Sequence, residues 1–215
     1  MHNLTGWQGC VCHGCLVCHP KVCCMLETLL VSTGIVTLAE IGDKTQLLAL
    51  LLAARYRKPI PIILGILVAT LANHLLAAAV GHQIAQLFSA ATLLWILAAS
   101  FLVVAAWTLV PDRLNDDGQI AVKYGPFMTT LVAFFIAEMG DKTQVATVML
   151  AAQFEYFWMV VCGTTLGMLL ANVPVVFVGN FAAERLPLKL IRFFAAASFL
   201  VFALYCAWQA LRTTG

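Results

Sequence analysis

Apolar residues fill most of this chain in long runs that short polar segments separate. Six runs reach the ~20 predominantly apolar residues that a membrane-spanning helix needs; they cover about 26–53, 59–87, 92–110, 125–152, 156–183 and 190–211. In hydrocarbon only helices and closed barrels satisfy the backbone, and runs such as LLALLLAA lack the alternation of a barrel strand. The pattern therefore predicts an all-α membrane protein with six transmembrane helices.

Composition and charge placement agree with this pattern. The chain is 62% hydrophobic and 10% charged, whereas soluble domains carry about 25% charged residues, so a soluble domain is excluded. The predicted loops around residues 82–91 and 153–156, on one side of the membrane, contain no Lys or Arg. The remaining loops contain the basic residues Arg55, Arg57, Lys58, Arg113, Lys123, Arg185, Lys189 and Arg192. The positive-inside rule places these basic loops in the cytoplasm and both termini outside.

The sequence also contains an internal repeat. Residues 39–46 read AEIGDKTQ and residues 137–144 read AEMGDKTQ, an offset of 98 that also aligns Gly65 with Gly163 and Gly81 with Gly179. Each copy covers three predicted helices, an odd number, so the second copy must enter the membrane from the opposite side. The predicted organisation is two inverted three-helix repeats, residues 25–110 and 125–215, joined by a cytoplasmic linker over 111–124.

The repeated motif interrupts two spans near mid-depth with polar side chains. On a continuous helix Glu40, Asp43 and Gln46 fall along one side, with Lys44 on the flank and Thr45 toward the back. The second copy orders its residues in the same way: Glu138, Asp141, Gln144, Lys142 and Thr143. Where the two faces meet, four carboxylates and two amides converge in an oxygen-rich site.

These buried charges allow two interpretations. Polar residues in spanning helices often hold helices together, and a Glu–Lys pair at i, i+4 neutralises itself. However, each charge at mid-membrane costs ~2.5–3.5 kcal/mol, and ionisable groups there are usually functional. Four carboxylates against two lysines leave a charge of minus two, which one divalent cation or two protons would neutralise. Oxygen ligands suit Mg, Ca or Mn, and sequence does not choose among the three.

Polar residues on neighbouring spans are candidates for supporting contacts. Asn73 and His74 lie on the second span and Asn172 on the fifth. Their ordinary role is interhelical hydrogen bonding, and the sharper hypothesis is that they contact the acidic residues from outside.

The duplicated E-x-G-D-K-T motif, here EIGDKT and EMGDKT, resembles the signature of the Gdt-type cation exchanger family. The resemblance covers residues 26–212. It implies that Glu40, Asp43, Glu138 and Asp141 form the cation site, with the lysines and threonines as further members of the signature. Bacterial members of that family export manganese, and Golgi members exchange Mn or Ca for protons. The compact chain is similar to the bacterial members, which favours export of Mn(II) across the plasma membrane.

The resemblance does not cover residues 1–24, which contain Cys10, Cys12, Cys15, Cys18, Cys23, Cys24, His13 and His19. This tract reads as a metal-binding segment, as a set of disulfide cysteines, or as a disordered tail or mis-assigned start before Met25. It also motivates a different class of function, a membrane thiol oxidoreductase, although Cys162 and Cys206 have no partner cysteine within a helical turn.

The expected activity is therefore secondary transport and not enzyme catalysis. The nucleotide-binding pattern G-x-x-x-x-G-K-[ST] is absent, so an ion gradient should drive the movement. The charge of minus two indicates exchange of one Mn(II) for about two protons, with a calcium/proton exchanger of the same fold as the alternative. We expect no permanently bound cofactor, Mn(II) as the transported substrate, the lipid bilayer as a partner and no nucleic acid.

Overall fold

The computed structural model describes residues 20–110, 125–178 and 188–214. Within them the regular structure consists of eight α-helices. They are α1 (Pro20–Glu40), α2 (Lys44–Tyr56), α3 (Pro59–Leu87), α4 (Ala90–Thr108), α5 (Pro126–Glu138), α6 (Lys142–Gln153), α7 (Phe157–Val178) and α9 (Leu188–Thr214). Some residues named in the sequence analysis lie outside the described residues: the linker over 111–124, Gly179, and the cysteines and histidines before Pro20. Cys23 and Cys24 lie in the first turns of α1.

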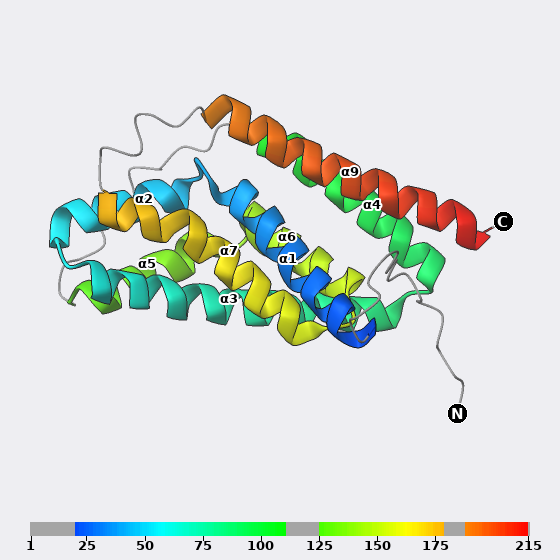
Figure 1. Cartoon of the computed structure of the whole chain (residues 1–215), viewed down its shortest axis with the longest axis horizontal. Coiled ribbons are helices and arrows are strands. Elements are labelled where there is room, and N and C mark those ends of the chain that lie inside the picture. The colour runs from blue at the N-terminus through cyan, green and yellow to red at the C-terminus, as the bar shows by residue number, and fades with distance from the viewer. Residues whose placement is uncertain (1–19, 111–124, 179–187, 215) are drawn as a thin grey trace.

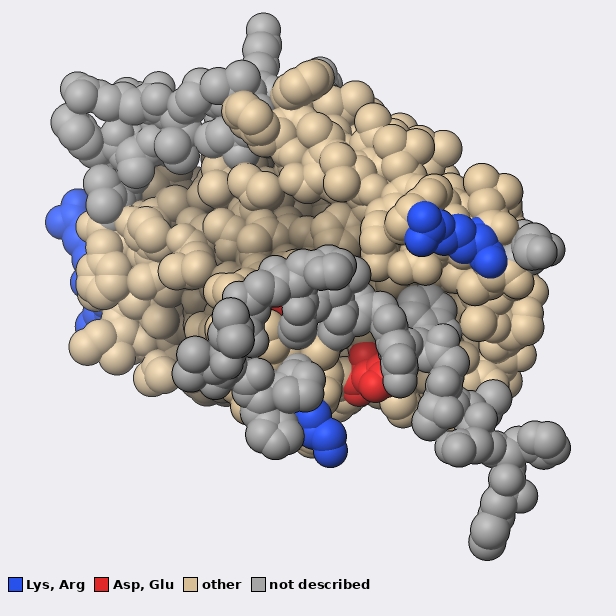
Figure 2. All heavy atoms as spheres, turned by 45° about the vertical axis from the view of Figure 1, so that its right-hand side comes forward, with Lys and Arg blue, Asp and Glu red and all other residues tan. Residues whose placement is uncertain are grey.

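The prediction of an all-helical membrane protein is confirmed. By length and composition, five of the described helices can cross a membrane: α1, α3, α4, α7 and α9, while α5 is apolar but shorter. In the view of Figure 2 uncharged residues cover most of the described surface, and the basic side chains gather in small groups near its edges. This surface suits a lipid environment, because charged groups are costly against hydrocarbon.

Two of the predicted continuous helices are interrupted, so the prediction of unbroken helices over 26–53 and 125–152 was wrong. The first helix ends at Glu40 and restarts at Lys44, and the second ends at Glu138 and restarts at Lys142. The cause is a glycine in each break: Gly42 has φ +82° and Gly140 has φ +75°, a left-handed conformation that other residues adopt only with strain. Glu40, Asp43 and Gln46 therefore do not share one side of a single helix.

The two halves of the chain have corresponding helices. The starts of α2, α3 and α4 at Lys44, Pro59 and Ala90 correspond, at the sequence offset of 98, to the starts of α6, α7 and α9. Packing is reciprocal as well, because α1 lies against α7 and α3 lies against α5. Figure 1 shows α4 and α9 side by side along one edge of the bundle, while α1 and α7 cross its middle. Each half thus packs mainly against the other half.

Glycines permit the closest approaches between the halves. A Cβ atom on Gly65 would lie 2.8 Å from Thr130 Cβ and 2.9 Å from Phe127 O. A Cβ atom on Gly163 would lie 2.7 Å from Leu29 O and 2.9 Å from Ser32 Cβ, which are the corresponding contacts of the other repeat. Small residues at these positions bring α3 against α5 and α7 against α1, as at other close helix crossings in membranes.

The close approach at Gly163 can be tested by adding one methyl group. We expect Gly163→Ala to lower the free energy of unfolding by ~1–3 kcal/mol, because the new Cβ would overlap α1. Titration with SDS in mixed micelles measures this quantity. Gly34→Ala on α1 is the matched control, since nothing lies within 4 Å of its Cβ and alanine favours a helix by up to ~1 kcal/mol. Equal losses in the two variants would contradict the packing described here.

Candidate functional site

The site is built around the two helix breaks. In each break the backbone closes a short turn, with Asp43 N donating to Glu40 O at 3.0 Å and Asp141 N donating to Glu138 O at 3.1 Å. The turn brings the glutamate at the end of one helix close to the aspartate before the next. A carboxylate pair is therefore presented at each interruption, near the middle of the interrupted segment.

Gln46 and Gln144 stabilise these turns. Gln46 Oε1 accepts a hydrogen bond from Gly42 N at 2.9 Å, and Gln144 Oε1 accepts one from Gly140 N at 2.6 Å. Gln46 Nε2 also donates to Ala171 O on α7 at 3.0 Å. The amide oxygens thus hold the broken backbone, whereas the sequence analysis expected them beside the carboxylates.

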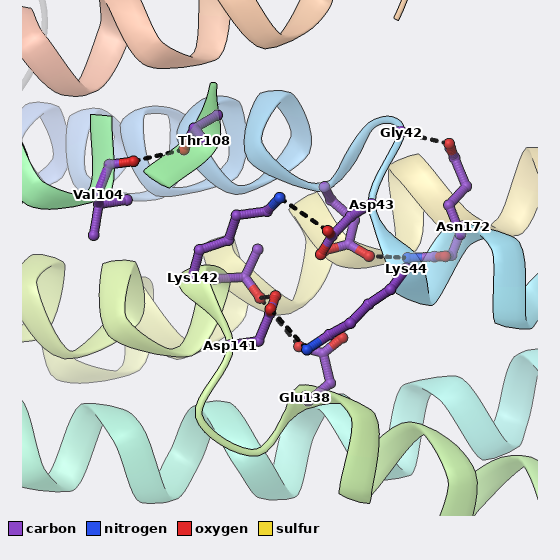
Figure 3. A network of polar contacts seen from close by, with 12 residues as sticks. Gly42, Asp43, Lys44, Val104, Thr108, Glu138, Asp141, Lys142 and Asn172 are labelled. Atoms are coloured by element: carbon purple, nitrogen blue, oxygen red, sulfur yellow. Dashed lines mark hydrogen bonds and ion pairs between the residues drawn. The ribbon is translucent and has the colours of Figure 1, made fainter. Parts of the chain in front are cut away.

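Lysines join the two breaks across the repeats. Lys44 Nζ lies 3.0 Å from Asp141 Oδ1, and Lys142 Nζ lies 2.9 Å from Asp43 Oδ1 (Figure 3). Both aspartates occupy N-cap positions of the following helices, but their side chains make no capping hydrogen bond. The carboxylates point across the repeats, so each half of the chain neutralises an acid of the other.

The site is removed from solvent. Glu40 and Glu138 are 0% exposed, Asp43 and Asp141 are 1% exposed, and the Lys142 side chain is 3% exposed. Lys44 differs from Lys142, its counterpart in the repeat, because 28% of its side chain is exposed. Interactions between charges are strong where water is excluded, and a buried charge without a partner is costly.

Three carboxylates form a possible ligand set for a cation. Glu40, Asp43 and Asp141 each offer an oxygen, and these atoms lie within 4.8 Å of one another. Oxygens at this spacing can surround a hard divalent ion, whose bonds to oxygen are about 2.0–2.6 Å long. Glu138 lies outside this group of three. Its Oε2 accepts a hydrogen bond from Thr143 Oγ1 at 3.1 Å, and the same hydroxyl lies 3.3 Å from Asp141 Oδ2.

The supporting residues have distinct positions. Asn172 Nδ2 donates to Glu40 Oε1 at 3.2 Å, so this residue contacts the acidic cluster directly. Asn73 Nδ2 donates to Phe135 O at 3.0 Å and joins α3 to α5. Thr45 and His74 are buried, and neither the threonine hydroxyl nor either ring nitrogen has a hydrogen-bond partner among the described residues.

The glycines of the motif are the residues whose role the sequence analysis missed. Gly42 and Gly140 create the breaks, whereas the apolar pattern predicted a continuous helix through each of them. The signal in the sequence was weak, because a helix tolerates an isolated glycine at a cost of only ~1 kcal/mol relative to alanine.

Comparison with known proteins identifies related chains. The family described as "Divalent cation/proton antiporter GDT1" matches twice, over residues 28–116 and 126–214. A Vibrio cholerae protein named "Putative manganese exporter" is 54% identical over 186 residues, which cover 86% of this chain and 92% of that protein. A GDT1-like protein of Synechocystis is 27% identical, over 86% of this chain and 98% of that protein. The divalent cation/proton antiporter GDT1 of Saccharomyces cerevisiae is 23% identical, over 87% of this chain and 86% of that protein. No solved structure is significantly similar to the chain.

The two lysine–aspartate pairs should differ in their effect on stability. Asp43→Asn removes the carboxylate charge that lies 2.9 Å from the buried Lys142 ammonium, and we expect a loss of ~3–5 kcal/mol in the free energy of unfolding. Asp141→Asn should cost less, because Lys44 is partly exposed and can turn toward solvent. SDS titration of both variants in mixed micelles measures the difference. An equal loss, or a larger loss for Asp141→Asn, would show that the exposure of the lysine does not govern the cost.

Proposed function

Because the chain belongs to the GDT1 family of divalent cation/proton antiporters, we propose that it exports Mn(II) from the cytoplasm in exchange for protons. The chain is a multi-pass membrane transporter of divalent cations and not an enzyme. The observation that carries the proposal is the buried cluster of Glu40, Asp43 and Asp141, whose carboxylate oxygens lie within 4.8 Å of one another.

The chemistry of the cluster favours a hard divalent cation as substrate. Its donors are carboxylate oxygens, and neither a thiolate nor an imidazole lies within the motif, so it suits Mn, Ca or Mg better than Cu or Zn. Manganese is favoured among the three by the name of the similar Vibrio cholerae protein. Glu138 is the fourth proposed ligand, because it is the counterpart of Glu40 in the repeat and is likewise 0% exposed.

A calcium/proton exchanger of the same fold is the second candidate, because the same oxygen ligands accept calcium. The thiol oxidoreductase alternative is excluded by membership of a transporter family.

Charge supports protons as the counter-ion. The four motif carboxylates and two lysines sum to minus two, so one divalent ion or two protons leave the cluster neutral in either direction of transport. A neutral cluster is also less costly to keep in the apolar interior than a charged one. We therefore propose exchange of one Mn(II) for about two protons.

We also propose that the two halves form inverted repeats with six membrane crossings, the interrupted pairs α1–α2 and α5–α6 each making one crossing. The reciprocal packing of α1 on α7 and α3 on α5 supports this arrangement. The basic loop at Arg55, Arg57 and Lys58 supports a cytoplasmic location for the turn between α2 and α3, which puts both termini outside the plasma membrane.

The proposed ligands can be tested in cells. Glu40→Gln, Asp43→Asn, Glu138→Gln and Asp141→Asn should each reduce Mn(II) export by at least ~10–100-fold, the loss that even outer partners of metal ligands cause. Accumulation of each metal element in cells that lack or express the protein measures export, and membrane content of each variant corrects for expression. Glu155→Gln is the control, because Glu155 is exposed and lies outside the motif. Normal manganese tolerance with any two of the four variants would defeat the shared site, and restored calcium balance without manganese export would favour the calcium exchanger.

Proton coupling can be tested in proteoliposomes that contain a pH-sensitive dye. An imposed Mn(II) gradient should move protons in the opposite direction, at about two protons per ion. Glu40→Gln should stop both fluxes together, since one cluster binds both ions. Manganese movement without proton countermovement, at several pH values and without sodium, would leave a uniporter or channel in place of an antiporter.

A further inference from the structure

We propose that Thr45 and His74 are positioning residues that hold Glu40 and Glu138 in the opposite-facing state of the transporter. This inference rests on the proposed function, because it requires a protein that alternates between two states. It follows from a mismatch between the two repeats at the centre of the site.

The two glutamates are held by donors that do not correspond in the repeat. Asn172 of α7 donates to Glu40 Oε1 at 3.2 Å, and Thr143 of α6 donates to Glu138 Oε2 at 3.1 Å. The offset of 98 pairs Asn172 with His74 and Thr143 with Thr45. By this correspondence Glu40 has the candidate donors Asn172 and Thr45, of which Asn172 is in use. Glu138 has the candidate donors Thr143 and His74, of which Thr143 is in use.

The two donors that are not in use, Thr45 and His74, are buried. Thr45 and His74 are both 0% exposed, and among the described residues neither has a hydrogen-bond partner for its polar side-chain atoms. One oxygen of each glutamate is in the same condition, Glu40 Oε2 and Glu138 Oε1. Buried polar groups in native proteins are nearly always paired, so these five atoms on the two glutamates, Thr45 and His74 call for an explanation.

Exchange of the two repeat conformations supplies the missing partners. In an inverted-repeat transporter the opposite-facing state arises when one repeat rocks against the other around the site. The exchange converts the Asn172–Glu40 bond into a His74–Glu138 bond, and the Thr143–Glu138 bond into a Thr45–Glu40 bond. A neutral imidazole carries one N–H donor, so His74 can replace the amide. Both states then have the same number of hydrogen bonds to the glutamates, which keeps their free energies close enough for exchange.

The surroundings of the two glutamates support this assignment. His74 lies on α3 and Glu138 on α5, which pack together, as do α7 with Asn172 and α1 with Glu40. The lysines show the same asymmetry, with 28% of the Lys44 side chain exposed against 3% for Lys142. In the described state Lys44 is therefore the more accessible of the two lysines, and the proposed exchange of conformations reverses this difference.

The exposure of the lysines provides a measure of the state. The full-length protein in nanodiscs is treated briefly with a small amine-reactive reagent, without manganese, and modification at Lys44 and Lys142 is measured by mass spectrometry. The exposed Lys58 corrects for reagent dose. A larger ratio of Lys44 to Lys142 modification reports more of the described state.

Loss of the two kinds of donor should shift this ratio in opposite directions. Thr45→Val and His74→Leu remove donors of the opposite-facing state and should raise the ratio about 5-fold, the effect of one hydrogen bond. Thr143→Val and Asn172→Leu remove donors of the described state and should lower it by a similar factor. Thr45→Ser and His74→Asn keep a donor and should restore the original ratio.

The threonine pair is sufficient for a decision, because valine matches threonine in shape and both variants should fold. A merely structural role predicts shifts of the same sign, or no shift, in Thr45→Val and Thr143→Val, and either outcome overturns the proposal. The measurement uses no transported ion. Failure of manganese export would therefore count against the proposed substrate and leave the ratio test intact.

Discussion

The pairing of buried charge across the two halves of the chain is the interaction on which the rest of the structure depends. Asp43 and Asp141 lie in an apolar bundle, where an unpaired charge is costly, and each finds its lysine in the other repeat at 2.9 and 3.0 Å. The close ion pair of each aspartate is thus made with the lysine of the other half. The packing of α1 on α7 and of α3 on α5 brings the two motifs together, and the glycines Gly65 and Gly163 make that packing close.

The helix breaks make this pairing possible. In a continuous helix the backbone satisfies itself and the side chains of Glu40 and Asp43 remain about one turn apart on a single rod. The left-handed Gly42 and Gly140 end the helices and leave backbone groups that require partners, and the amides of Gln46 and Gln144 supply them. Irregular backbone at such a depth is tolerated where it is enclosed by protein or lines a cavity. Its presence in both repeats places the carboxylates where an ion can be bound between the two halves of the chain.

The site nevertheless departs from the symmetry of its sequence. The motif copies are nearly identical, yet Glu40 contacts Asn172 while Glu138 contacts Thr143, and one lysine is much more exposed than the other. A symmetric cluster would hold an ion equally from both sides. The proposed exchange between two states would use this difference, because the near identity of the motifs allows the two halves to swap their contacts.

The sequence by itself determined that the protein lies in a membrane, that it is helical and that it contains a repeat. Long apolar runs and a duplicated motif are local properties of the chain. It also identified Glu40, Asp43, Glu138 and Asp141 as the candidate ligands, since charges in apolar runs are costly without a function. Only the tertiary structure decided that the helices break at Gly42 and Gly140, that Lys44 and Lys142 pair across the repeats, and that Gln46 and Gln144 cap the turns. The offset of 98 reveals which residues correspond, but identical motifs carry no information about which of several donors each carboxylate accepts. That choice depends on how the two packed halves are placed relative to each other, and for Glu40 the donor is Asn172, more than a hundred positions away in the other half.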